Sequence, residues 1–329
     1  MRVLITGMAG FIGHHIAEHI LKTTDWEIIG LDRLDYAGTC HRIEEIYDRS
    51  LYANRVKFIW HDLRAPINEY VYEKIEGYSI DHILHLAACT HVDRSIRNPY
   101  ECVMDNVIGT LNILEFLKDT NVHRFIYFST DEVFGPAPSG IKFNEWDRYN
   151  SKNPYAAAKA GAEELCLAYA NTYSLPIIIT HCMNAFGERQ NSEKFIPSTI
   201  KKILDGEKVQ IHADEKLTTI GSRHYLYAQN IAHAITFLLT SGKVICDKYN
   251  IVGTKEVNNL DLAQQIAQIV NEPLDYELVD FHSSRPGHDL RYALENGKLE
   301  KLGFRYPYDF DTSLSNTVQW YLNNREWLN

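Results

Sequence analysis

The run Arg2-Val3-Leu4-Ile5-Thr6-Gly7-Met8-Ala9-Gly10-Phe11-Ile12-Gly13 decides the fold class of this chain. Its apolar first part predicts a short strand over residues 3–6, and helical periodicity begins at Phe11 and continues to Leu21. The three glycines allow a tight turn and a close backbone approach, and a helix N-terminus presents free N–H groups to a pyrophosphate. Because the glycines stand between a strand and a helix, they predict a dinucleotide site.

Strand and helix signals alternate over the first half of the chain. Further strands are predicted over residues 27–31, 56–60, 82–86, 124–128 and 177–180, and helices over 99–117 and 155–173. Strands rich in Ile and Val that are separated by helices indicate the α/β class with a doubly wound parallel sheet, that is, a Rossmann-like fold.

The regular alternation ends near residue 185, beyond which the elements become shorter, with a helix near residues 260–270. We expect an NAD-binding Rossmann domain over residues 1–182 and a smaller C-terminal substrate-binding lobe over residues 183–329, with some interleaving of the chain. The sequence has no Ser/Gly-rich linker, so the two parts should be tightly joined.

Composition excludes several classes of function. The net charge of −10 and the pI near 5.8 argue against a nucleic-acid partner or an anionic membrane surface. An anionic ligand must then be held by a few placed Arg and Lys side chains. Six cysteines without C-x-x-C spacing, an opening apolar run too short for a signal peptide and no run of 18 apolar residues predict a cytoplasmic protein with reduced thiols and no membrane span.

The residue that follows the second predicted strand bears on the choice of cofactor. Asp32 lies 19 residues beyond Gly13, where a carboxylate accepts hydrogen bonds from an adenosine ribose and repels a 2′-phosphate. This favours NAD over NADP, although the adjacent Arg33 weakens the preference.

A metal motif also occurs in the first predicted helix. His15-Ile16-Ala17-Glu18-His19 matches the H-x-x-E-H pattern of some zinc proteases. A catalytic zinc needs three placed ligands, and no third ligand is evident. We therefore expect exposed helical histidines and no metal.

Two short motifs carry chemistry. Tyr155 and Lys159 are spaced i, i+4 and share one helix face, where an ammonium would lower the pKa of the phenol toward working pH. Such a pair suits the oxidation of a sugar alcohol by NAD⁺. Thr130-Asp131-Glu132 follows the strand over 124–128, and two adjacent carboxylates indicate proton transfers at neighbouring carbons. They can act as acid and base only if their environments separate their pKa values.

Together these motifs resemble the extended short-chain dehydrogenase/reductases, and within them the nucleotide-diphospho-sugar 4,6-dehydratases, most of all those that act on dTDP-glucose. The resemblance covers nearly the whole chain. It is carried by Gly7–Gly13, Leu31-Asp32-Arg33-Leu34, His85-Leu86-Ala87-Ala88, His91-Val92-Asp93-Arg94-Ser95-Ile96, Ser129–Gly135, Pro154-Tyr155, Lys159 and Arg285-Pro286-Gly287-His288-Asp289.

The resemblance implies a hydro-lyase with tightly bound NAD: oxidation at C4, loss of water across C5 and C6, and return of the hydride to C6. Tyr155 and Lys159 would act at the C4 hydroxyl, and Thr130 would hydrogen-bond the C4 oxygen. Glu132 would remove the C5 hydrogen, while Asp131 would protonate the departing C6 hydroxyl.

The resemblance also implies binding residues and an assembly. Asp62 and Leu63 would contact adenine, and a homodimer would form through helices at 99–117 and 153–173. The implied cofactor-binding residues are Gly7, Gly10, Phe11, Ile12, Gly13, Asp32, Arg33, Asp62, Leu63, Leu86, Ala87, Ala88, Tyr155 and Lys159. The implied residues on the nucleotide-sugar side are Thr90, Thr130, Asn184, Lys194, Phe195, Gln210, Ile211, His212, Arg223, Asn259, Arg285 and His288.

Departures from the family pattern leave the substrate open. They lie at Asn184-Ala185, Gln210-Ile211-His212 and residues 223–230, where nucleobase and sugar would be recognised. A UDP-sugar or an N-acetylated sugar nucleotide therefore remains an alternative to dTDP-glucose. An epimerase or decarboxylase of the same superfamily is a second alternative and a non-catalytic NAD-sensing protein a third; the pair Asp131-Glu132 argues against both.

Overall fold

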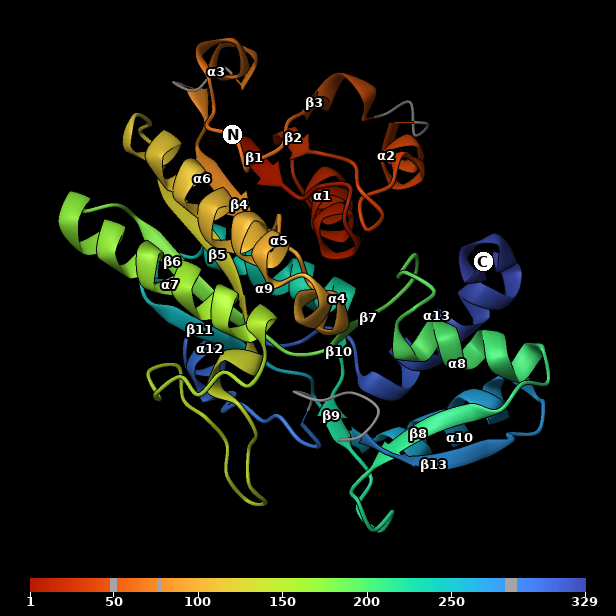
Figure 1. The fold of residues 1–329 in the computed structure, drawn as a ribbon. Coiled ribbons are helices and arrows are strands. Elements are labelled where there is room, and N and C mark those ends of the chain that lie inside the picture. The colour runs from red at the N-terminus through yellow and green to blue at the C-terminus, as the bar shows by residue number, and fades with distance from the viewer. Residues whose placement is uncertain (48–51, 76–78, 282–288) are drawn as a thin grey trace.

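The computed structural model describes residues 1–47, 52–75, 79–281 and 289–329, and a seven-stranded parallel sheet lies at its centre (Figure 1). The strand order is β11-β6-β5-β4-β1-β2-β3, with every neighbouring pair parallel. This confirms the predicted doubly wound α/β fold. The strands are β1 (Arg2–Thr6), β2 (Glu27–Asp32), β3 (Val56–Trp60), β4 (His82–His85), β5 (Arg124–Thr130), β6 (Ile177–Cys182) and β11 (Lys248–Ile251).

Helices cover both faces of this sheet because successive apolar residues of each strand point to opposite sides. Val3 and Ile5 pack on one face and Leu4 on the other. The first face is covered by α1 (Phe11–Thr23), α2 (Cys40–Tyr47), α9 (Ala228–Thr240) and α12 (Gly297–Lys301). The second is covered by α3 (Glu69–Ile75), α6 (Gly109–Lys118) and α7 (Pro154–Tyr173), and α6 and α7 lie side by side in Figure 1.

The C-terminal part of the chain forms a smaller lobe with its own hydrophobic core. It combines α8 (Phe195–Leu204), α10 (Asn259–Val270) and α13 (Phe310–Asn323) with the parallel pair β8 (Val209–Ala213) and β13 (Tyr276–Asp280). Two small ribbons connect it to the sheet: β7 (Ala185–Phe186) with β10 (Leu226–Tyr227), and β9 (Ser222–His224) with β12 (Glu256–Asn258). The chain interleaves, since α9, β11 and α12 follow residue 182 yet pack on the first domain.

The predicted helix over residues 99–117 is interrupted. It consists of α5 (Pro99–Val103), a π-helical turn (Met104–Ile108) and α6. A π-helical turn holds an extra residue, which rotates the faces of the helix after it, and such turns are frequent at functional sites. Asn106 of this turn is buried, and its side chain exchanges two hydrogen bonds with the backbone of Cys89, at 2.8 and 3.1 Å, in the loop after β4.

One buried arginine joins the glycine-rich turn to the lobe. Arg42 of α2 is 1% exposed. Its guanidinium donates to the backbone oxygens of Ala9 and Ala37 in the first domain, and to Arg189 O and Asn191 Oδ1 in the segment before α8. Burial lowers the pKa of Arg42 to about 10. Because its hydrogen bonds reach both parts of the chain, Arg42 fixes them relative to each other.

The histidines of α1 are not exposed, so this part of the sequence prediction is wrong. His14, His15 and His19 are all buried because α9 packs over α1. The His15 ring instead contacts Glu188 O at 2.9 Å and the Gln229 amide at 3.1 Å. Among the described residues, no group of three or more His, Cys, Asp or Glu side chains could hold a metal ion.

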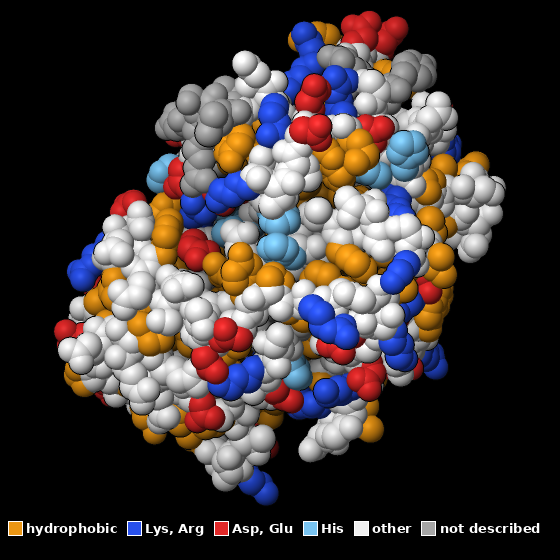
Figure 2. Space-filling view, turned by 180° about the vertical axis from the view of Figure 1, so that it is seen from behind, with side chains coloured by type: hydrophobic (Ala, Val, Ile, Leu, Met, Phe, Trp, Pro, Cys, Tyr) orange, Lys and Arg blue, Asp and Glu red, His pale blue; other side chains and the backbone are white. Residues whose placement is uncertain are grey.

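The surface is mixed in charge. On the face seen from behind, Lys and Arg side chains are interspersed with Asp and Glu, and no continuous basic patch covers the described residues in that view (Figure 2). Within the same described ranges, none of the helices combines the length and the apolar character needed to cross a bilayer.

Candidate active site

A cleft of about 550 Å³ lies at the carboxyl edge of the sheet, between the strands and the lobe. This is where parallel α/β sheets bind ligands, because loops diverge where the strand order reverses. Here the order reverses between β1 and β4. The cleft is lined by every implied cofactor residue, from Gly7 to Lys159, and by Thr90, Thr130, Asn184, Lys194, Phe195, Gln210, His212, Arg223 and Asn259.

The remaining implied residues are Ile211, Arg285 and His288. Ile211 is fully buried in the core of the lobe and does not line the cleft, so its assignment to the substrate is wrong. The alternation of β8 explains this, because its neighbours Gln210 and His212 face the cleft on the other side of the strand. Arg285 and His288 lie outside the described residues.

The glycine-rich turn has the shape that a dinucleotide requires. Gly7 has φ +73°, and a Cβ there would lie 2.7 Å from the backbone N of Ala87. A Cβ at Gly13 would lie 2.2 Å from Gly7 O. Gly10 is the N-cap of α1 and makes no side-chain cap hydrogen bond, and the first residues of the helix line the cleft. These features fit a pyrophosphate at the N-terminus of α1.

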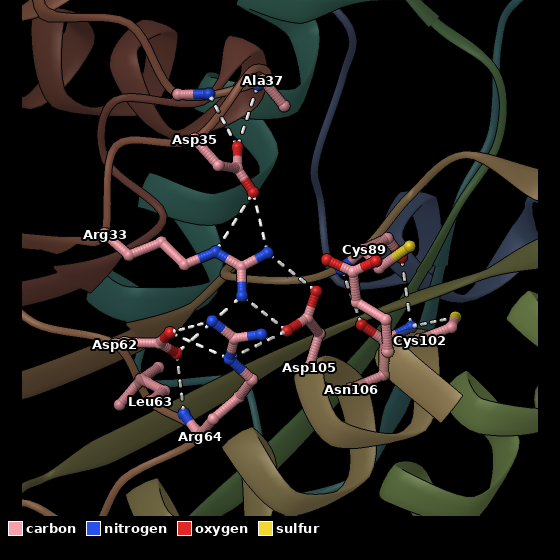
Figure 3. Close-up of polar contacts among 12 residues, drawn as sticks. Arg33, Asp35, Ala37, Asp62, Leu63, Arg64, Cys89, Cys102, Asp105 and Asn106 are labelled. Carbon is pink, nitrogen blue, oxygen red and sulfur yellow. Dashed lines mark hydrogen bonds and ion pairs between the residues drawn. The ribbon is translucent and has the colours of Figure 1, made fainter. Parts of the chain in front are cut away.

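The carboxylate of Asp32 is held in place at the other side of this turn. Oδ2 accepts from Ala9 N at 3.0 Å and Oδ1 from Leu34 N at 2.9 Å. The guanidinium of Arg33, the next residue, lies in a cluster with Asp35 and Asp105 (Figure 3). The residues expected at the adenosine end are thus brought together around an oriented carboxylate.

The acid pair is positioned by a helix turn and a helix cap. β5 ends at Thr130, whose Oγ1 accepts from Glu132 N at 3.3 Å and starts a 3₁₀ turn over Asp131–Phe134. Asn153 caps α7 by accepting from Ala156 N at 2.8 Å and also donates to Glu132 Oε2 at 3.0 Å. One side chain therefore connects the start of α7 to the carboxylate at the end of β5.

The environments of the two carboxyl groups differ, as the chemistry requires. Asp131 is 4% exposed, and its Oδ2 has no hydrogen-bond partner among the described residues. Burial, and then the charge of Glu132, raise the pKa of Asp131 to about 7. Burial also raises the pKa of Glu132, but the Asn153 amide stabilises its carboxylate and opposes that rise. Asp131 is therefore suited to hold a proton and Glu132 to accept one.

The tyrosine and the lysine both lie in the cleft, and burial opposes the lowering of the tyrosine pKa that the sequence predicts. Burial, and then the charge of Glu132, raise the pKa of Tyr155 well above 10, and burial lowers the pKa of Lys159 to about 8. The Lys159 ammonium donates to Phe128 O and lies 4.3 Å from the centre of the Tyr127 ring. Thr130, whose hydroxyl hydrogen-bonds the phenol, opposes the rise at Tyr155.

Asp289 and Tyr292 are among the cleft residues that sequence reasoning missed. Asp289 and Tyr292 line the cleft, and the Tyr292 hydroxyl donates to Asp289 Oδ2 at 3.0 Å. Arg223 lies 4.8 Å above the Tyr292 ring and donates to Leu290 O at 2.6 Å. Asp289 closes the motif that begins at Arg285, which was a usable signal, whereas no motif marked Tyr292.

Comparison with known proteins agrees with this geometry. The family described as GDP-mannose 4,6 dehydratase matches residues 4–317. The chain belongs to this family. It is 34% identical over 353 residues to a dTDP-glucose 4,6-dehydratase of Salmonella typhimurium, covering 100% of this chain and 95% of that protein. It is 37% identical over 330 residues to a trifunctional UDP-glucose 4,6-dehydratase of Arabidopsis thaliana, covering 99% of this chain and 47% of the plant protein.

Solved structures of family relatives share the whole fold. A dTDP-glucose 4,6-dehydratase from Streptomyces venezuelae, with NAD and TYD bound, has a TM-score of 0.88 at 33% identity over 99% of this chain and 98% of its own. A UDP-glucuronic acid 4-epimerase from Bacillus cereus, with NAD bound, has a TM-score of 0.87 at 25% identity over 100% of both chains. The fold is thus common to dehydratases and epimerases, and the site residues must distinguish them.

Proposed function

We propose that this protein is an NAD-dependent nucleotide-diphospho-sugar 4,6-dehydratase, a hydro-lyase, with dTDP-glucose as its first candidate substrate. The observation that carries this proposal is the pair Asp131 and Glu132 in one cleft with Tyr155. The two carboxyl groups differ in hydrogen bonding: Asp131 Oδ2 has no partner among the described residues, whereas the Asn153 amide donates to Glu132 and opposes the rise in its pKa, as an acid and a base acting on neighbouring carbons require. The similarity to dTDP-glucose 4,6-dehydratases over the full chain supports the same reaction.

Each side chain has one proton to move. Tyr155 in its phenolate form takes the proton of the C4 hydroxyl, and Thr130, which opposes the rise in the pKa of Tyr155, hydrogen-bonds the same oxygen. Glu132 then removes the C5 hydrogen, which the C4 ketone makes acidic, and would return that proton to C5 as the hydride reaches C6; Asn153 orients its carboxylate. Asp131 gives its proton to the C6 hydroxyl as water leaves. Positioned acid and base groups contribute about 10²- to 10⁴-fold each to such steps.

The cofactor fits the other half of the cleft. When bound, NAD⁺ supplies the hydride acceptor at C4 and the hydride donor at C6. Gly7, Gly10 and Gly13 would leave room for the pyrophosphate, and Asp32 would face the ribose. The loop over residues 86–88 lines the nicotinamide side, and Asn106 holds the backbone of the adjoining residue 89.

A UDP-sugar is the second candidate substrate. Trifunctional UDP-glucose 4,6-dehydratases of Arabidopsis thaliana are 36–37% identical to this chain over 99% of its length. Gln210 and His212, which depart from the dTDP-glucose pattern, line the cleft in the lobe. Both substrates lose the same water from the sugar, so the alternative changes only which nucleoside, with its base and pentose, the lobe binds.

Assembly and location are further parts of the proposal. Tyr100, Val103 and Ile96 are 76%, 42% and 38% exposed beside α7, and large apolar side chains grouped in this way support a homodimer through α5, α6 and α7. Size-exclusion chromatography with light scattering tests this, and a single-chain mass would contradict it. The free cysteines and acidic net charge support a cytoplasmic location.

The proposed reaction is tested by mass spectrometry of nucleotide sugars after incubation with the purified protein. With dTDP-glucose or UDP-glucose we expect the loss of one water from the sugar and no accumulation of reduced cofactor. An isomer of unchanged mass would indicate an epimerase, and no product from either nucleotide sugar would leave a non-catalytic protein; both results contradict the proposal.

A further inference from the structure

Two neighbouring residues at the end of β2 give opposite signals about the cofactor. A carboxylate at this position binds the 2′-hydroxyl of NAD, whereas a nearby arginine accommodates the 2′-phosphate of NADP. Asp32 supplies the first and Arg33 the second. Which signal prevails depends on whether the guanidinium of Arg33 is available to a phosphate.

The structure shows that Arg33 already has two carboxylate partners (Figure 3). Its Nη1 and Nη2 donate to the two oxygens of Asp105 at 2.6 and 2.8 Å. Its Nε and Nη2 donate to Asp35 Oδ2 at 3.1 and 2.8 Å. This bidentate pairing with Asp105 is the geometry in which arginine would otherwise bind a phosphate.

The two partners are themselves held in place. Asp105 belongs to the π-helical turn, and its side chain is only 6% exposed. Asp35 Oδ1 accepts from Ala37 N and Gly38 N at 2.9 and 3.3 Å, so it is part of the loop after β2. Arg33 therefore cannot turn toward a ligand without leaving a nearly buried carboxylate unpaired, which is costly.

The negative charge around Arg33 also disfavours the binding of a 2′-phosphate. Asp62, which also lines the cleft, pairs with Arg64 and lies 3.8 Å from Arg33 Nη1. With Asp32, Asp35 and Asp105, carboxylates outnumber guanidinium groups at this end of the cleft. A phosphate monoester carries about −1.5 to −2 charge at pH 7 and would be repelled here.

We propose that Asp105 and Asp35 set the dinucleotide selectivity of this protein by occupying Arg33, so that Asp32 alone recognises the ribose and a 2′-phosphate is excluded. Asp105 is a positioning residue, since it acts through Arg33. The inference rests on the proposed use of a dinucleotide cofactor and adds the residues that choose between NAD and NADP.

The test measures which dinucleotide the protein retains. The purified protein is exchanged against an excess of NAD⁺ and NADP⁺ in equal amounts and desalted, and the bound dinucleotides are quantified by mass spectrometry. Wild type should retain NAD⁺ in large excess. In Asp105→Asn the ratio of NADP⁺ to NAD⁺ should rise by about tenfold, the effect of one charged partner, and Asp35→Asn/Asp105→Asn should raise it further.

Two controls make the result specific. Asp119→Asn removes a charge from the other end of the same helical segment and should leave the ratio unchanged. Arg33→Ala/Asp105→Asn should lose the gain in NADP⁺, because the gain requires a released guanidinium. If the Asp105 variants do not fold, Asp35→Asn alone provides the test, because the Asp35 side chain is 35% exposed and its replacement disturbs the core less. This variant should itself raise the ratio of NADP⁺ to NAD⁺.

The outcomes separate this inference from the proposed function. An unchanged ratio in the Asp35 and Asp105 variants, with dinucleotide still bound, would overturn the inference and leave the proposed dehydratase intact. A gain that persists after Arg33→Ala would also overturn it, because the effect would not act through Arg33. A wild-type protein that retains neither dinucleotide would contradict the proposed function and the inference together.

Discussion

Replacing Asp131 with asparagine should stabilise the folded protein at alkaline pH while removing the general acid. The carboxyl pKa is about 7 in the folded protein against an ordinary 3.8, chiefly because Asp131 is buried. The folded state therefore binds more protons than the unfolded state between these two values. The free energy of unfolding falls as pH rises through this window, and above it the full penalty of about 4 kcal/mol is present. Asparagine keeps the shape and never becomes charged.

The assay is the difference in melting temperature between Asp131→Asn and wild type at about pH 4.5 and about pH 8. Linkage gives a change of about 3 kcal/mol in their stability difference between these pH values. At about 2.1 cal/mol/K per residue, a chain of 329 residues shifts by about 1.5 °C per kcal/mol, so the gap should widen by about 4 to 5 °C.

Asp119→Asn is the matched control, since it removes one carboxylate from an exposed position. Its difference from wild type should stay nearly constant over the same pH range. If the Asp131 gap is also constant, the carboxyl group titrates near its ordinary pKa, and the assignment of Asp131 as a proton donor at neutral pH fails with it.

Three further results are expected. Glu132→Gln should abolish loss of water while NAD⁺ is still bound, measured by mass spectrometry and by dinucleotide retention; normal turnover would remove Glu132 from the mechanism. Arg42→Met should lower the free energy of unfolding by about 3 kcal/mol, because its four oxygen partners lose buried donors, whereas the exposed Lys255→Met should change it little. A thermal denaturation no different from the Lys255 variant would contradict this. Burial lowers the pKa of His15 from 6.5 to about 4, so the unfolded state binds more protons in that window and stability is lost as pH falls through it. Between about pH 7 and about pH 4, the free energy of unfolding of His15→Gln should fall by about 3 kcal/mol less than that of wild type, as measured by thermal denaturation. An equal loss in both proteins would refute this prediction.

Much of the fold could be predicted because its signals are local. The glycine-rich turn and the alternating strands predicted the sheet, and the helix expected over 155–173 is α7 almost to the residue. The helix over 99–117 was wrong in detail. The π-helical turn at Met104–Ile108 is stabilised by contacts that sequence periodicity does not contain, including those between Asn106 and the backbone of Cys89.

Burial was the second source of error. His15 and His19 follow a polar spacing that is typical of an exposed helix face, yet α9, more than 200 residues away in the chain, covers them. Ile211 was assigned to the substrate along with its neighbours, although one residue along a strand reverses the direction of the side chain. Both errors concern which side of an element faces the core.

The sequence by itself determined the fold class and the family resemblance, and it predicted the acid, the base and the tyrosine, because each is carried by short motifs whose geometry is fixed by neighbouring residues. Only the tertiary structure decided how those groups are tuned. The pKa of Asp131 depends on burial and on Glu132, and the availability of Arg33 depends on Asp105, 72 residues away. Electrostatic effects depend on distance in space and on exposure to water, and neither can be read from separation along the chain.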